Sequence, residues 1–152
     1  LRQARTLSAE ETKDLTQLES IWYEGEVSAG EHYNWTRYYA LNLHSVFYRG
    51  TVEWRCFNST LHAGKVAAYV NLCLAISAQA IAQRSTVMRK TRSDNELFTF
   101  RVWLVRLGLN GDEFKHTRDH LLANLEGDRA WRYDKDSYEV NRKKKKQREA
   151  ER

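Results

Sequence analysis

The chain has 152 residues, of which 41% are hydrophobic, and this composition suits one domain with an apolar core and excludes a disordered or collagen-like chain. The formal net charge is +5, but residues 141–152 contain seven basic and two acidic residues and so carry the whole excess. The first 140 residues are therefore neutral, which argues against a domain whose main surface binds nucleic acid.

The cysteines and the N-terminal sequence indicate the cellular compartment of the protein. Cys56 and Cys73 lie in apolar surroundings without the spacing of a metal site, which fits a reducing environment. No apolar stretch typical of a signal peptide follows Leu1, so we expect a cytoplasmic protein. Because the sequence starts with Leu and not with Met, we interpret it as a fragment, a processed product or an incompletely registered chain.

The first predicted element is a helix at residues 9–23. Ser8 and Glu11 form a capping box at its start, in which each side chain can bond to the backbone N–H of the other residue. Gly25 and Gly30 mark its end and a connecting loop.

The clearest β signal is a hairpin. Residues 38–48 and 51–57 are rich in aromatic and β-branched residues, as strands are. Arg49 and Gly50 between them suit a two-residue turn, in which Gly50 supplies a positive φ. We therefore predict an antiparallel hairpin in which the numbers of two paired residues add up to 99.

This register puts a polar set on one face of the hairpin. Asn42 and His44 share that face with Glu53 and Arg55, and His44 lies opposite Arg55. Such a set can coordinate a divalent cation through Glu53 and hold a phosphate or a carboxylate through Arg55. An ordinary solvated face with a cross-strand ion pair contains the same residues, and the spacing by itself favours that interpretation.

A helix is predicted at residues 62–84. Residues 66–82 carry no charge but include Asn71, Ser77 and Gln79, and the run is shorter than the about 20 residues that a membrane span needs. We therefore expect a buried central helix and no contact with a membrane.

Two further helices are predicted, at residues 94–107 and 111–125. Ser93 and Glu96 form a capping box for the first of them. Gly108 follows its last apolar residue and is well placed to end it.

Two remaining clusters carry metal-binding groups or charge. His116 and His120 are four residues apart on a predicted helix, but the Glu of a zinc-protease motif is absent, so we interpret both as solvated. The basic tail around Lys143–Lys146 is typical of a solvated charge run. It offers a contact to nucleic acid or to an acidic partner, although it lacks the interleaved aromatic residues of a single-strand binding surface.

One stretch resembles a known family. From Arg37 to Lys65 it reads Arg-Tyr-Tyr-Ala-Leu-Asn-Leu-His-Ser-Val-Phe-Tyr-Arg-Gly-Thr-Val-Glu-Trp-Arg-Cys-Phe-Asn-Ser-Thr-Leu-His-Ala-Gly-Lys, and residues 37–84 are similar to the C-terminal half of amidoligase family members. Residues 109–131 also resemble members of this family. The family is grouped with the glutamine synthetase-like carboxylate–amine ligases, in which an antiparallel sheet forms a funnel-like active site with helices behind it. The resemblance therefore implies an α+β fold, with an antiparallel hairpin or sheet backed by several α-helices and a mostly helical C-terminal half.

The resemblance also implies roles for the polar face. Glu53 would be a Mg²⁺ ligand, and Arg55 would hold the substrate carboxylate or the transferred phosphate. Asn42 would line the pocket. His44 would contact the substrate, without an assigned part in proton transfer.

The implied chemistry has two steps. ATP phosphorylates a carboxylate, and an amine then displaces phosphate from the acyl phosphate, with Mg²⁺ bridging the phosphates. Arg37 and Arg49 are further candidates for phosphate contacts, with solvated loop arginines as the alternative interpretation. The substrates would be small amines and amino acids, or side chains of peptides and proteins.

The resemblance divides the chain into an N-terminal helix and connecting loop (1–36), the C-terminal part of a catalytic domain (37–133) and a charged, basic tail (134–152). In the family, other metal carboxylates lie in the N-terminal half, and no second Glu-x-Glu strand occurs here. We therefore expect the C-terminal portion of an ATP-dependent carboxylate–amine ligase, incomplete without that half or another chain. Two alternatives stay open. One is a non-catalytic α+β module that binds protein or nucleic acid through its basic tail or exposed aromatic residues, and the other is a structural remnant that assembles with another chain.

Overall fold

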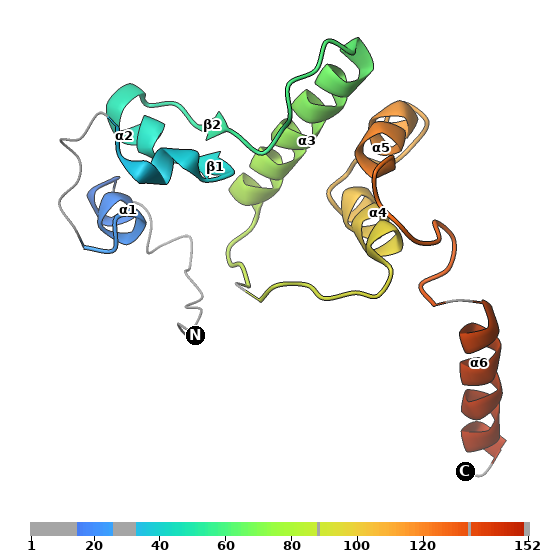
Figure 1. The fold of residues 1–152 in the computed structure, drawn as a ribbon. Coiled ribbons are helices and arrows are strands. Elements are labelled where there is room, and N and C mark those ends of the chain that lie inside the picture. The colour runs from blue at the N-terminus through green and yellow to red at the C-terminus, as the bar shows by residue number, and fades with distance from the viewer. Residues whose placement is uncertain (1–14, 26–32, 88, 134, 151–152) are drawn as a thin grey trace. The chain divides into compact units, whose positions relative to one another are not determined.

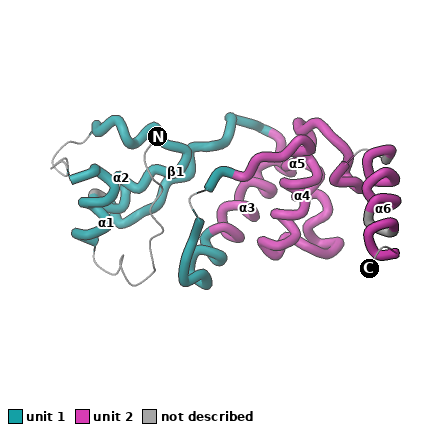
Figure 2. The backbone as a smooth tube through the Cα atoms, turned by 90° about the horizontal axis from the view of Figure 1, so that it is seen from below, with its two compact units in different colours: residues 1–61, 77–90 teal, residues 62–76, 91–152 magenta. Residues whose placement is uncertain are grey.

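The computed structural model describes residues 15–25, 33–87, 89–133 and 135–150 (Figure 1). Within these ranges the chain forms six α-helices, one short 3-10 helix and a two-stranded antiparallel sheet. The fold is therefore α+β, as the sequence predicted. The chain divides into two compact units, which Figure 2 colours separately: residues 1–61 with 77–90, and residues 62–76 with 91–152.

The first unit contains the sheet and the N-terminal helices. The sheet is small, because its two strands have two residues each. In chain order the elements are helix α1 (Leu15–Trp22), 3-10 helix η1 (Trp35–Tyr38), strand β1 (Leu41–Asn42), helix α2 (His44–Arg49) and strand β2 (Glu53–Trp54).

The predicted long hairpin is wrong, because α2 occupies the second half of its first strand. Leu43, Val46 and Phe47 are apolar at positions i, i+3 and i+4, which is the period of a helix. Once the helix forms, few residues remain to extend the sheet. Asn42 pairs with Glu53, so the numbers of paired residues add up to 95 and not to 99.

Gly50 has the positive φ that the sequence predicted, but it ends a helix and does not form a hairpin turn. Its φ is 66°, and its N–H donates to the carbonyl oxygen of Val46. Gly is favoured at such a position because it has no Cβ to clash in the left-handed conformation. Gly25, with a φ of 85°, follows α1 as predicted, whereas the capping box at residues 8–11 and Gly30 lie outside the described residues.

The second unit is helical, and its core lies where α4 packs against α5. It contains α3 (Ala63–Ala82) up to residue 76, followed by three further helices. These are α4 (Glu96–Arg106), α5 (Lys115–Leu122) and α6 (Lys135–Ala150), and the buried leucines of the unit are Leu72, Leu97, Leu104, Leu107, Leu109 and Leu122.

The helix predicted at residues 94–107 is present as α4, but its N-cap is Asn95 and not Ser93. Oδ1 of Asn95 accepts from the N–H of Phe98 at 3.0 Å, whereas Oγ of Ser93 donates to the carbonyl oxygen of Asn95. Asn and Ser are equally good N-caps, so a sequence pattern does not separate two candidates two residues apart. Gly108 follows the helix with a φ of 96°, as predicted.

The helix predicted at residues 62–84 is present as α3, but the prediction that it is buried is wrong. Its buried residues are Ala68 and Leu72, whereas Val70 and Leu74 are 51% and 64% exposed. By length and composition α3 could cross a membrane, and 11% of its most apolar stretch is buried in this chain. One such helix is weak evidence for a membrane span, because core helices of other proteins pass the same test.

The first turn of α3 meets α5 at a glycine. A Cβ at Gly64 would lie 2.5 Å from Nε2 of His120, and the rings of His62 and His120 meet edge to face with centroids 4.9 Å apart. Further along, Nδ2 of Asn71 on α3 donates to Oγ1 of Thr117 on α5 at 2.8 Å. His120, which the sequence suggested was solvated, is therefore a packing residue between two helices.

Leu104 provides a test of the helical core, because its side chain is fully buried at 0% exposure. We expect Leu104→Ala to lower the free energy of unfolding by about 2–5 kcal/mol, since it removes buried methyl groups and leaves a cavity. Urea unfolding followed by circular dichroism measures the change. Leu61→Ala is the matched control: Leu61 is fully exposed, so the change should stay within about 0.5 kcal/mol. Equal losses in the two variants would show that the core lies elsewhere.

Candidate functional site

A cleft of about 550 Å³ opens in the first unit, among residues of η1, β1, α2 and β2. Because α2 begins two residues after β1 ends, side chains of β1, β2 and α2 meet in one small space. The cleft is lined by Arg37, Asn42, His44, Ser45, Arg49, Thr51, Val52, Glu53 and Trp54.

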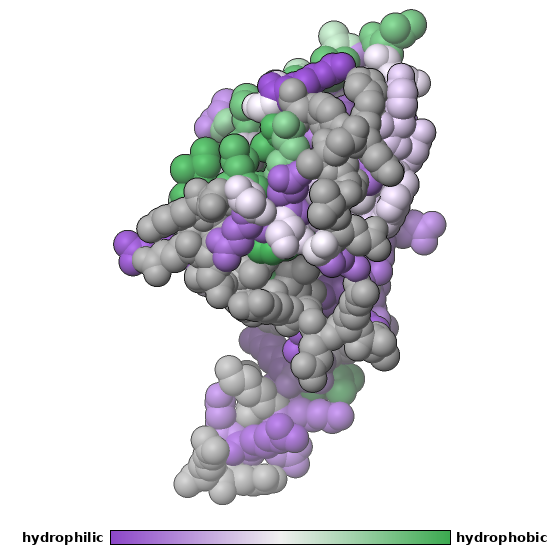
Figure 3. Space-filling view, turned by 90° about the vertical axis from the view of Figure 1, so that its left-hand side faces the viewer, coloured by the Kyte–Doolittle hydropathy of each residue, from purple (hydrophilic) through white to green (hydrophobic). Residues whose placement is uncertain are grey.

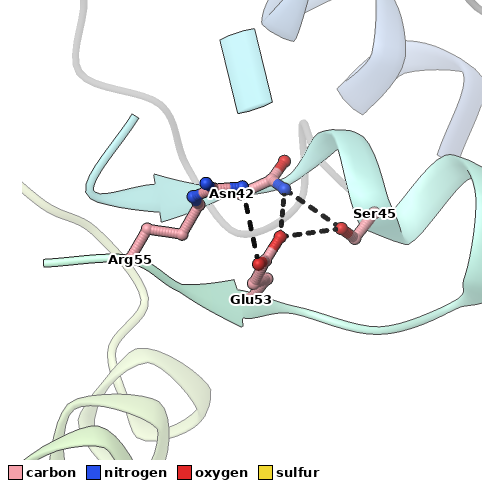
Figure 4. Close-up of polar contacts among 4 residues, drawn as sticks. All are labelled: Asn42, Ser45, Glu53 and Arg55. Carbon is pink, nitrogen blue, oxygen red and sulfur yellow. Dashed lines mark hydrogen bonds and ion pairs between the residues drawn. The ribbon is translucent and has the colours of Figure 1, made fainter. Parts of the chain in front are cut away.

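The amide of Asn42 connects the elements around this cleft (Figure 4). Asn42 is buried, and its Nδ2 donates to Oε2 of Glu53 at 2.5 Å and to Oγ of Ser45 at 3.1 Å. Oγ of Ser45 in turn lies 3.5 Å from the same oxygen of Glu53. The three side chains come from β1, β2 and α2, so one amide links both strands to the helix.

Each carboxylate oxygen of Glu53 faces a nitrogen. Oε2 accepts from Asn42, and Oε1 lies 3.6 Å from a guanidinium nitrogen of Arg55. The guanidinium group of Arg55 lies 5.4 Å from the ring centre of Tyr38, and that of Arg37 lies 5.6 Å from the same ring. Because the face of an aromatic ring attracts cations, Tyr38 holds two arginines near the cleft.

His44 does not lie opposite Arg55, as the sequence predicted, but at the first position of α2. The strand ends at Asn42, so the next residues turn into the helix and the ring of His44 is buried. Nδ1 of His44 is hydrogen-bonded to the hydroxyl group of Tyr23, whose ring also packs on Phe47. The hydrogen bond joins the end of α1 to α2, so His44 positions one wall of the cleft.

A second buried polar group holds η1, the 3-10 helix that carries Arg37. Nε1 of Trp22 donates to Oγ1 of Thr36 at 3.0 Å, and Oγ1 of Thr36 donates to Oδ1 of Asn34 at 2.7 Å. The same Oδ1 accepts from the backbone N–H of Thr36 and so caps the short helix. Arg37 therefore projects from a backbone that α1 holds in place.

Five of the six site residues proposed from the sequence line the cleft, and the sixth, Arg55, reaches it through its ion pair with Glu53. Two further polar residues line the cleft. The predicted hairpin put Thr51 on the polar face without giving it a role, and it put Ser45 on the opposite, apolar face, which is wrong. A helical interpretation of residues 43–49 would have removed the strand alternation that put Ser45 on the apolar face.

The charge on the lining favours an anion. Arg37 and Arg49 contribute positive charge, and the negative charge of Glu53 is already paired with Arg55. Guanidinium groups present several N–H donors in a plane, which matches carboxylate and phosphate oxygens. The cleft therefore suits an anionic group of a substrate or nucleotide.

The lining fits a Mg²⁺ ion in part. Mg²⁺ is commonly held by one or two carboxylates, with substrate phosphates and water completing six oxygen ligands. Glu53 supplies one carboxylate, and Oδ1 of Asn42 is buried without a hydrogen-bond partner among the described residues. The described part of the chain contains no group of three or more His, Cys, Asp or Glu residues that could hold a metal. The lining residues therefore fit a metal ion that arrives with phosphate oxygens, not one that these residues hold by themselves.

Comparison with known proteins connects the cleft to a family. A model of the family described as "putative amidoligase enzyme" matches residues 1–77, which is half of the chain and includes every residue that lines the cleft. Residues 109–131, for which the sequence predicted a similar resemblance, lie outside the match. No curated protein and no solved structure matches the chain.

The Asn42 amide can be tested by its removal. We expect Asn42→Ala to lower the free energy of unfolding by about 1–3 kcal/mol, because it breaks two hydrogen bonds in a buried position. Asn110→Ala, at an exposed position, is the control and should change it by less than about 0.5 kcal/mol. Urea titration of both variants gives the comparison, and an Asn42 variant as stable as the control would show that the amide does not hold the strands and α2 together.

Proposed function

Because the chain belongs to the family of putative amidoligase enzymes, we propose that it forms part of the active site of an ATP-dependent carboxylate–amine ligase. The observation that carries the proposal is the cleft itself. Within the matched residues it combines one carboxylate, Glu53, with arginines that can hold anionic oxygens. An amide-forming ligase needs these groups, because its substrates and intermediate carry carboxylate and phosphate charges.

The proposed reaction forms and breaks two bonds in turn. A carboxylate oxygen attacks the terminal phosphorus of ATP, and the bond from that phosphorus to the ADP oxygen breaks to leave an acyl phosphate. The nitrogen of an amine then attacks the acyl carbon, the carbon–oxygen bond to phosphate breaks, and the amine loses a proton to give the amide. When bound, Mg²⁺ neutralises charge on the phosphates.

The arginines of the cleft have the clearest roles in this scheme. Arg37 and Arg49 would orient phosphate oxygens, which keeps the reacting atoms in line. Arg55 would bind the substrate carboxylate or the transferred phosphate once its ion pair with Glu53 opens. The pair is 3.6 Å long and partly exposed, so opening it costs little.

Glu53 would contact the metal, and Asn42 would position it. Because both oxygens of Glu53 already face nitrogens, a cation has to displace one of these contacts. That exchange is favourable when nucleotide phosphates bring further oxygen ligands and occupy the arginines. His44, held by Tyr23, would contact the substrate at the wall of the cleft.

We propose further that this chain supplies the C-terminal part of the site, with the remaining carboxylates coming from the N-terminal half of the family fold or from another chain. The proposed substrates are a small amine and the carboxylate of an amino acid or peptide, in a cytoplasmic setting. The second candidate function is a non-catalytic binding module, and what supports it is the strongly basic helix α6.

Isothermal titration with Mg²⁺ and a non-hydrolysable ATP analogue tests the proposal, on this chain and on the longest open reading frame that contains it. We expect the longer protein to bind the analogue with Mg²⁺, and Mg²⁺ without nucleotide to give no measurable heat. Glu53→Gln keeps the shape of the side chain and should weaken binding at least about tenfold, because one charged ligand contributes more than about 1.4 kcal/mol. Arg37→Gln should have a similar effect.

Arg84→Gln is the control, since Arg84 is exposed and is not one of the residues that line the cleft. Its binding should equal that of the unaltered protein. The enzymatic proposal fails if the longer protein binds no nucleotide at millimolar concentration. It also fails at this site if Glu53→Gln and Arg37→Gln bind as the control does.

A further inference from the structure

A second hollow, in the helical unit, combines aromatic rings with basic residues. It has a volume of about 630 Å³ and lies between α4 and the start of α6. We call it the aromatic pocket, and its principal lining residues are Phe98, Trp131, Arg132, Tyr138, Asn141 and Arg142. None of these residues belongs to the cleft or to the segment that matches the family.

The backbone under Trp131 is held in place by two polar side chains. Nδ2 of Asn95 donates to the carbonyl oxygen of Trp131 at 2.7 Å and to that of Asp128 at 3.2 Å. Oδ1 of Asp128 accepts from the N–H groups of Ala130 and Trp131 at 2.6 and 2.9 Å. Because Asn95 is also the N-cap of α4, the loop that carries Trp131 is anchored to the helical core. A ligand that used this ring would not have to order the loop first.

The aromatic rings of the pocket are open to solvent. Trp131 and Tyr138 pack on each other with ring centroids 5.0 Å apart, yet both stay more than 40% exposed. Tyr133 is also about half-exposed, and the guanidinium group of Arg132 lies over its ring. Flat apolar rings exposed beside cations are well suited to stacking with a flat, anion-bearing ligand.

Positive charge continues from the pocket along α6. The helix contains seven basic and three acidic residues, and Figure 3 shows it as mostly hydrophilic. Arg142 lines the pocket, and Lys143 and Lys144 follow it as exposed residues. A helix advances about 5.4 Å per turn, so its basic residues can meet phosphates that are spaced along an extended strand.

From this arrangement we propose that the aromatic pocket and α6 bind single-stranded nucleic acid. A base would stack on Trp131 and Tyr138, its edge would face the amide of Asn141, and phosphates would contact Arg142 and the lysines after it. An acidic peptide would satisfy the charges but leave the exposed rings unused, so nucleic acid fits more of the surface. The basic run from Arg142 onward has no aromatic residue, and the structure places the rings of Trp131 and Tyr138 beside its start.

Fluorescence anisotropy with a labelled oligothymidylate tests the proposal on the unaltered chain. We expect binding that weakens as salt is raised, since phosphate contacts release counterions. Trp131→Ala should weaken binding about tenfold or more, because one lost stacking contact has about that effect. Trp131→Phe, which keeps a stacking ring, should retain most of it. Arg142→Gln should weaken binding and reduce its dependence on salt.

The controls separate stacking from charge and from folding. Trp35→Ala removes a tryptophan that is 64% exposed in the first unit, and Arg84→Gln removes an exposed arginine there, so neither should change binding. Circular dichroism establishes that each variant folds. Glu53→Gln should bind the oligonucleotide normally, which distinguishes this site from the nucleotide site proposed above.

Four results would overturn the proposal. A base-free polyphosphate that binds as tightly as the oligonucleotide, with no effect of Trp131→Ala, would reduce the site to charge attraction. A polyglutamate peptide that binds while the oligonucleotide does not would assign an acidic protein partner instead. Thymidine monophosphate that binds as tightly as the oligonucleotide would assign a free nucleotide. Loss of oligonucleotide binding in Glu53→Gln, but not in Trp131→Ala, would place the contact in the cleft.

Discussion

The hydrogen bond from Asn42 to Glu53 is the contact on which the first unit depends. A sheet with two residues in each strand is too small to be stable by its backbone pairing. The amide of Asn42 adds a side-chain link between the strands and, through Ser45, a link to α2. The cleft exists because these elements are held together. The carboxylate that we assign to the metal is therefore also part of the scaffold, and its two uses compete for the same oxygens.

The polar face could be predicted although the hairpin could not. Side chains alternate faces along a strand, so a register error of an even number of residues leaves every side chain on its predicted face. The predicted and observed sums of paired residue numbers, 99 and 95, differ by an even number. Asn42 and Glu53 therefore share a face in either register. His44 was misplaced because the strand ends before it, and an apolar i, i+3, i+4 pattern over so short a run fits helix and strand alike.

Other features depend on contacts that a sequence pattern does not encode. The apolar sequence of α3 predicts a helix, but it does not predict which of its side chains pack against other elements. Several apolar side chains of α3 are exposed in the structure. The sequence predicted a solvated charge run in the basic tail; the structure forms this run into helix α6, with Lys143 and Lys144 exposed. Tyr138 on α6 packs on Trp131, and the loop that carries Trp131 is held by Asn95, 36 residues earlier in the chain. The composition of the tail does not predict the hydrogen bond from Asn95 to Trp131.

The close approach at Gly64 has a consequence for how this sequence can evolve. A Cβ at this position would lie 2.5 Å from the ring of His120. A larger residue at position 64 therefore requires the ring to move, or a smaller side chain at position 120. The two positions are 56 residues apart in the chain, yet a change at one alters which changes the other tolerates. Among related sequences this pair should covary: glycine with an aromatic or imidazole ring, and a bulkier residue with a small one. The effect of a substitution at one position would then depend on the residue at the other, even though neither residue belongs to the cleft.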